Sequence, residues 1–188
     1  MSSIKLTADS GGGTFEIKAP ASSANTRVLT LPDSGNYILG GKILQVVQTV
    51  KTDTFTTTST SFTDITGMSA SITPQSTDSK ILVDVNLSYG GNNFNFFCDL
   101  LRGSTTIGAA PSGNNNCTLA LCGITTTTYQ IFNGSILFLD SPGVDSATTY
   151  KLQIACQSGG EFFLNRSKRD STADGTCTSS ITLSEVAS

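Results

Sequence analysis

The sequence contains no histidine and no tryptophan, and only 13% of its residues are charged. Histidine is the commonest general base and the commonest metal ligand in proteins, so its absence removes the usual route to either kind of site. The net charge is −3 and no run of like charges occurs, which argues against a nucleic-acid partner bound through a basic face. These absences point away from an enzyme, and they predict no metal and no cofactor.

The sequence also lacks any segment that would place it in or across a membrane. It begins MSSIKLTADSGGG, without the basic start and apolar core of a signal peptide. No apolar stretch approaches the roughly 20 residues that a membrane-spanning helix requires. We therefore expect a protein that is made in a cytoplasm and has no membrane partner.

Five cysteines are present, and an odd number argues against a complete set of disulfides within the chain. A zinc site would have to consist of thiolates alone, because there is no histidine. We expect buried or half-buried thiols that act as small hydrophobic side chains. A disulfide between Cys117 and Cys122, which would close a short loop, is the alternative. The remaining cysteines are Cys98, Cys156 and Cys177.

Serine and threonine, by contrast, make up more than a quarter of the chain and lie between short alternating strands. Threonine favours pleated, half-buried surfaces, where its branched side chain packs and its hydroxyl faces water. The alternation is strictest at Ile81, Val83, Val85 and Leu87. The strands predicted after residue 42 are 43–51, 69–73, 80–88, 94–102, 105–109, 117–125, 129–139, 149–156, 161–165 and 179–186.

This strand pattern predicts an all-β fold, an antiparallel jelly-roll β-sandwich of about ten strands preceded by a short β-rich N-terminal arm. We place the arm at residues 1–41 and the jelly-roll knob domain at residues 42–188, with Gly40-Gly41 as the joint. The last strand, 179–186, is expected in the middle of a sheet, where it would hold the C-terminal segment in place.

The arm reads as three short strands at residues 4–7, 15–18 and 27–31, with turn residues between them. Strands this short cannot bury a core alone, so they must lie on a partner surface. We expect the arm to attach by adding strands to a neighbouring sheet. The anchoring side chains would be Ile4, Leu6, Phe15, Ile17, Val28, Leu29 and Leu31.

Aromatic residues exceed what the inward side of a strand can hold. Phe94, Phe96 and Phe97 share one strand, and Phe162 and Phe163 share another. Because successive side chains point to opposite faces, part of this aromatic surface must be covered by something else. We expect a subunit interface containing Phe94, Phe96 and Phe162. The alternative is a central strand that is buried on both sides.

Two loops carry charged residues. Loop 165–175 holds the densest charge in the chain, and Arg166, Lys168 and Arg169 are its candidate contact residues, with a solvated loop tip as the alternative. Loop 140–145 would offer two aspartates to calcium, but it lacks the ligand density of a calcium site. Solvated strand ends explain the carboxylates near strands better, so the sequence offers no catalytic residue.

Two segments of the arm, Phe15-Glu16-Ile17-Lys18-Ala19-Pro20 and Leu29-Thr30-Leu31-Pro32-Asp33-Ser34-Gly35-Asn36, resemble the start of many bacteriophage structural proteins. The remainder resembles the trimeric jelly rolls related to tumour necrosis factor. The resemblance implies a homotrimer on the surface of a virus particle, with the major capsid protein or another virion protein as partner. It carries over no catalytic residue. The segments that carry the second resemblance are 79–83, 101–103, 148–152 and 180–186.

Two virion roles compete for this chain. In the first, the arm anchors a trimeric capsid decoration (cement) protein; in the second, it attaches a tail fibre whose knob recognises a receptor or glycan on the host surface. A fibre usually needs a shaft, and no heptad, collagen-like or β-helix repeat occurs before the knob. The decoration role is therefore favoured. Another structural role, or an enzyme such as a glycan hydrolase, ranks behind both.

Overall fold

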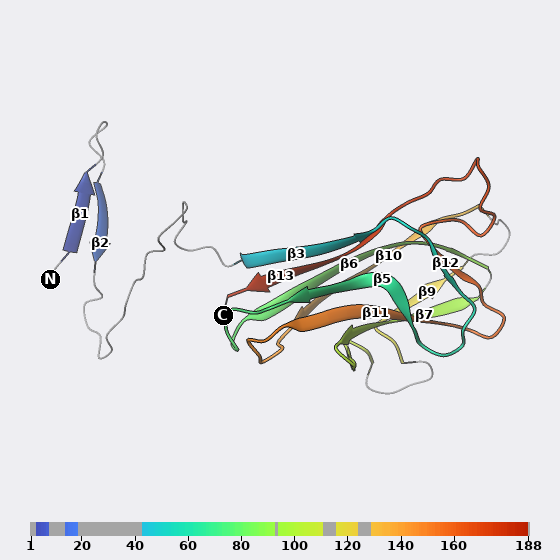
Figure 1. Cartoon of the computed structure of the whole chain (residues 1–188), viewed down its shortest axis with the longest axis horizontal. Helices are drawn as coiled ribbons and strands as arrows, with labels where there is room; N and C mark the ends of the chain where they lie inside the picture. Colours follow the sequence, from blue (N-terminus) through green and yellow to red (C-terminus); the bar gives the residue numbers. More distant parts are fainter. Residues whose placement is uncertain are drawn as a thin grey trace. The chain divides into compact units, whose positions relative to one another are not determined.

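The computed structural model describes residues 3–7, 14–18, 43–92, 94–110, 116–123 and 129–187 (Figure 1). The chain divides into two compact units, Met1–Leu39 and Gly40–Ser188, which are taken separately below. All regular structure in the described residues is β-strand. Those residues accordingly contain no helix long and apolar enough to cross a membrane.

The first unit contains a two-stranded antiparallel sheet. Strand β1 (Ser3–Thr7) pairs with β2 (Thr14–Lys18), so that position 4 lies opposite position 17 and position 6 opposite position 15. Both strands were predicted, and their register brings four of the seven expected anchor positions onto one face of the pair. The third predicted strand, with Val28, Leu29 and Leu31, lies outside the described residues.

The second unit is a sandwich of two antiparallel sheets, as predicted (Figure 1). The first sheet contains β3, β4, β6, β10, β12 and β13, and the second contains β5, β7, β8, β9 and β11. The strands are β3 (Ile43–Lys51), β4 (Phe55–Thr57), β5 (Thr63–Ile72), β6 (Lys80–Gly91), β7 (Asn95–Arg102), β8 (Thr105–Ile107), β9 (Leu119–Cys122), β10 (Phe132–Asp140), β11 (Thr148–Cys156), β12 (Phe162–Leu164) and β13 (Ser179–Val186).

The strand order is that of a jelly roll. Four strands of the first sheet run β3-β13-β6-β10, and four of the second run β5-β11-β7-β9. The chain passes from the second sheet to the first and back as it runs from β5 through β6 to β7. It does so again as it runs from β9 through β10 to β11. Strand β13 lies between β3 and β6, which confirms that the C-terminal strand is central. Such a strand is paired on both edges, which holds the end of the chain in the sheet.

The core lies between the two sheets and follows directly from alternation in the sequence. Ile81, Val83 and Val85 of β6 point inward and are fully buried, as are Leu152 and Ile154 of β11. Burial of each such side chain contributes roughly 1.5–3 kcal/mol before the cost of ordering the chain. The hydrophobic effect on these alternating positions therefore selects the register of both sheets.

The sandwich has two distinct ends, which matter for function. Val186 lies opposite both Ile43 and Lys80, so the chain enters the sandwich at the same end where β13 finishes; we call this the entry end. Strand β6 ends at Gly91 at the opposite end, where Cys156 pairs with Phe96; we call this the distal end. In Figure 1 the entry end carries the start of β3 and the distal end carries β12.

Buried polar groups close the entry end of the core. Glu185 is fully buried, and its carboxylate accepts hydrogen bonds from Gln45 Nε2 at 2.6 Å and from the backbone N–H of Gln75 at 2.7 Å. Asp140 is also buried and binds Arg102 Nη1 at 2.9 Å and Tyr150 Oη at 2.7 Å. These partners satisfy carboxylates that would otherwise be costly to bury.

Candidate functional site

The outer face of the first sheet is unusually apolar. Val46 and Leu137 are 58% and 71% exposed, although both belong to regular strands. Cross-strand pairing places Leu139 beside Leu82, Leu82 beside Ser184, and Ser184 beside Val46, so one row runs across four strands. The exposed large hydrophobic residues that share this surface, which we call the apolar face, are Ile43, Val46, Val50, Leu137 and Leu139.

The apolar face carries little charge among the described residues. Lys80 and Asp84 of β6 are its charged side chains, and they lie among serines, threonines and asparagines of the neighbouring strands. Desolvating these two charges against a partner would oppose burial of the face, whereas the neutral side chains around them cost less to cover. The run Ile136-Leu137-Phe138-Leu139 is the sequence signal for this face, because four successive apolar residues in a strand must expose two of them.

The outer face of the second sheet is built differently. Ser71 and Thr149 share a hydrogen bond of 2.7 Å across β5 and β11. Asp64 accepts hydrogen bonds from Lys151 Nζ at 2.8 Å and from Gln153 Nε2 at 2.7 Å. The Lys151 hydrogen bond, with that of Gln153, holds the pKa of Asp64 below its ordinary value. Most of this face is therefore suited to water.

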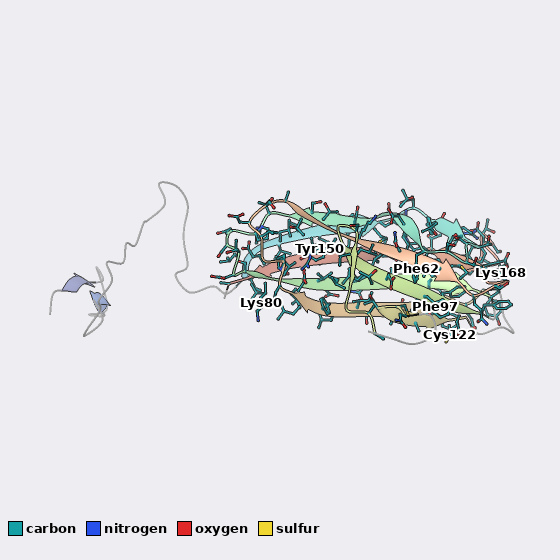
Figure 2. The ribbon with its side chains drawn as sticks, turned by 90° about the horizontal axis from the view of Figure 1, so that it is seen from below. Phe62, Lys80, Phe97, Cys122, Tyr150 and Lys168 are labelled. Carbon is teal, nitrogen blue, oxygen red and sulfur yellow. The ribbon has the colours of Figure 1, made fainter. Side chains whose placement is uncertain are left out.

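A hollow of about 420 Å³ lies at the distal end of the second sheet. Phe97 of β7 points outward there because its neighbour Phe96 points into the core. Phe62 from the loop before β5 lines the same hollow, and both residues are labelled in Figure 2. The residues that line this aromatic hollow are Thr60, Phe62, Phe97, Ala155, Cys156, Gln157 and Ser158.

The phenylalanines expected at a subunit interface lie elsewhere. Phe96 and Phe162 are fully buried in the core, where their rings meet edge to face at 5.4 Å and each contacts Tyr89. Phe94 is half-buried and lies over Gly159, next to the β11–β12 turn. Phe96 and Phe162 have no surface to offer a second chain, which corrects the expectation for these two residues. Phe96 lies on β7 of the second sheet and Phe162 on β12 of the first, and both rings fill the core between the sheets.

The three cations of loop 165–175 lie near one another, but each is paired locally. Arg166 binds Asp170 at 3.3 Å and its guanidinium lies 4.4 Å from the ring centre of Phe163. Lys168 pairs with Glu161, and Arg169 pairs with Asp174. The hydrogen bond from Arg169 holds the pKa of Asp174 well below its ordinary value. The loop therefore presents paired charges in place of a basic patch.

Asn165 anchors this loop to the sandwich, a role that the sequence did not reveal. It is fully buried with φ 63°, in the left-handed region that asparagine tolerates better than most residues. Its Nδ2 donates to the backbone oxygens of Lys51 and Asp53, both at 2.9 Å. Its Oδ1 accepts a hydrogen bond of 2.6 Å from Ser179 Oγ. One side chain thus ties the loop to β3 and β13.

The remaining candidate residues serve structure. All five cysteines are free thiols, so the Cys117–Cys122 disulfide is not formed. Cys98 and Cys156 are buried, and burial raises the pKa of both thiols, whereas Cys122 is exposed, contrary to expectation. Asp140, one of the two aspartates of loop 140–145 that calcium could use, forms an ion pair with Arg102. Among the described residues, no group of three or more potential metal ligands gathers.

Comparison with known proteins leaves the chain without a family. No family model matches it, and no curated protein matches it. A chain in the structure of infectious bursal disease virus, Gx strain, is similar at 12% sequence identity with a TM-score of 0.37. That match covers 97% of this chain and 50% of the viral chain, so this chain spans about half the length of that one. A similarity this weak assigns neither family nor function.

Proposed function

We propose that this chain is a non-enzymatic structural protein of a bacteriophage virion, a homotrimeric capsid decoration protein attached through its N-terminal arm. The apolar face is the observation that carries the proposal. The short phage-like segments of the arm support the virion setting, and the shortage of catalytic side chains in the sequence favours a role in attachment. The protein would lie on the particle surface after synthesis in the host cytoplasm.

Trimer formation would cover the apolar face. Its exposed leucines and valines lie in paired strands, so their backbone is already ordered and burying them costs side-chain entropy alone. Each large apolar side chain that is fully covered contributes roughly 1.5–3 kcal/mol, and a stable interface typically buries about 800 Å² on each partner. Covering the face also takes Lys80 and Asp84 out of water, a cost that the burial of the apolar side chains must exceed. These contacts take the place of Phe96 and Phe162, while Phe94 stays a predicted interface residue.

Attachment would use the first unit. A two-stranded sheet such as β1–β2 is marginal alone and gains stability by pairing with another sheet. The chain leaves this unit and enters the sandwich at the entry end, where Ile43 begins β3.

A tail-fibre or receptor-binding knob is the second candidate, and one observation favours it. The aromatic hollow lies at the distal end, away from the point where the arm joins the sandwich. A knob that contacts a host surface would carry its binding site at such a position. Both candidates share the arm, the trimer and the absence of catalysis.

The test combines assembly with location on the particle. Analytical ultracentrifugation of the full chain should give a trimer, and a variant without residues 1–41 should remain a folded trimer that no longer binds particles. Gold-labelled antibody should mark the capsid shell. Gold on the tail alone would transfer the protein to the fibre role, and full capsid occupancy by the truncated protein would exclude attachment through the arm.

A further inference from the structure

The aromatic hollow has a lining that excludes most classes of ligand. None of its seven residues carries a carboxylate, an ammonium or a guanidinium group. The one titratable group, the Cys156 thiol, donates a hydrogen bond of 3.4 Å to the backbone oxygen of Thr57, and burial raises its pKa. An ionic ligand such as a phosphate or an acidic peptide would therefore lose its hydration without gaining a counter-charge. The chemistry of the hollow suits a neutral ligand.

Two kinds of surface meet in this hollow. Phe62 and Phe97 supply aromatic rings, while Thr60, Gln157 and Ser158 supply hydroxyl and amide groups. The face of an aromatic ring is electron-rich and attracts weakly positive C–H groups. A pyranose sugar presents a face of C–H groups surrounded by hydroxyls that both donate and accept hydrogen bonds. The hollow, at about 420 Å³, also falls within the range of small-ligand sites.

The walls of the hollow are held in place before any ligand binds. The N–H of Cys156 donates to the backbone oxygen of Ser59 at 2.7 Å, which fixes the loop that carries Phe62. The N–H of Gln157 donates to the backbone oxygen of Asn95 at 2.9 Å, and Gln157 Oε1 accepts from the N–H of Asn95 at 3.2 Å. A site fixed in this way loses little entropy on binding.

From these observations we propose that the aromatic hollow is a binding site for a neutral saccharide, with one pyranose ring lying against Phe62 and Phe97. Gln157, Thr60 and Ser158 bind its hydroxyls. The site goes beyond the structural role proposed above and does not depend on it. Because the hollow belongs to the second sheet, it stays open when the apolar face of the first sheet is covered.

Saturation-transfer difference NMR on the full-length protein tests the proposal, since it detects weak ligands of large assemblies. The probes are glucose, galactose, mannose and N-acetylglucosamine, each at millimolar concentration. At least one should receive saturation, strongest at the C–H protons of one ring face. Phe62→Ala and Gln157→Ala should each weaken binding about tenfold, the loss of one good contact.

Val144→Ala is the matched control, because Val144 is 38% exposed against 37% for Phe62 and lies outside the hollow, in the β10–β11 loop. It should leave binding unchanged, and thermal unfolding should confirm that all variants fold. No transfer to any of the four sugars would overturn the proposal, as would transfer that survives Phe62→Ala. Transfer seen only after removal of residues 1–41 would also overturn it, because the arm would then be the occupant.

Discussion

The two outer faces of the sandwich are built from the same kind of alternating strand, yet they meet their surroundings in opposite ways. The first sheet exposes Leu137 and Val46 with few charges around them. The second sheet covers itself with hydrogen-bonded pairs such as Ser71–Thr149 and with the Asp64–Lys151 ion pair. The difference teaches that the fold constrains only the side chains that point into the core. The outward side chains can vary, and they determine what each face of the sandwich can contact.

The largest effect is expected when the apolar outer face of the first sheet is made as polar as the outer face of the second sheet. The double variant Leu137→Asp, Leu139→Asp places two carboxylates on the apolar face without touching the core. Burying an unpaired charge costs several kcal/mol, so sedimentation equilibrium should show the proposed trimer replaced by monomer, with association weakened at least about a thousandfold. Thr149→Asp on the second face is the control and should stay trimeric. An unchanged trimer in the double variant would show that the apolar face is not the interface.

The next effect sharpens the comparison between the two sides of a single strand. Phe96 is fully buried and its neighbour Phe97 is half-buried on the outside, so the same substitution samples core and surface. Phe96→Ala should lower the free energy of unfolding by about 3–5 kcal/mol, because it leaves a cavity. Phe97→Ala should cost less than about 1.5 kcal/mol. Chemical denaturation measures both, and equal losses would contradict the inward and outward assignment.

The smallest effect concerns the polar face and depends on pH. The folded-state pKa of Asp64 is lowered, so the stabilisation it gives is fully present above the pKa of the unfolded chain and is lost as pH falls through the folded value. Asp64 is partly exposed, so Asp64→Asn should cost less than about 1 kcal/mol at pH 7. Thermal unfolding at pH 7 and at pH 2 should show that this difference becomes smaller in acid. A larger loss in acid than at neutral pH would contradict it.

Much of the fold was predictable because alternation is a local signal. The strands at 43–51 and 179–186 match the structure at both ends, since each combines β-branched and apolar residues over the length of a single strand. Strand β4 (Phe55–Thr57) was missed, because a single phenylalanine among threonines shows no period. Strand β5 begins at Thr63, earlier than predicted, where Gly67 and a shift in the pairing with β11 interrupt the alternation.

The candidate site was harder to predict, because it depends on which side of a strand faces the core. The excess of phenylalanines indicated that at least one ring points away from the core. That ring belongs to Phe97, whereas Phe96 and Phe162 are buried in the core. Phe62 lies in a threonine-rich loop with no local sign that it meets Phe97. Such a meeting is set by pairing between strands far apart in the sequence.

The place where the chain enters the sandwich also determines how the protein would carry a mechanical load. Strand β3 begins at the entry end and runs toward the distal end, paired along its length with the central strand β13. If the start of β3 is held and the distal end is pulled, the force acts along β3. The hydrogen bonds of an antiparallel ladder lie across the strands, so they resist this force together as a shear joint. A load between the start of β3 and the distal end of the sandwich would thus be shared by the whole β3–β13 ladder.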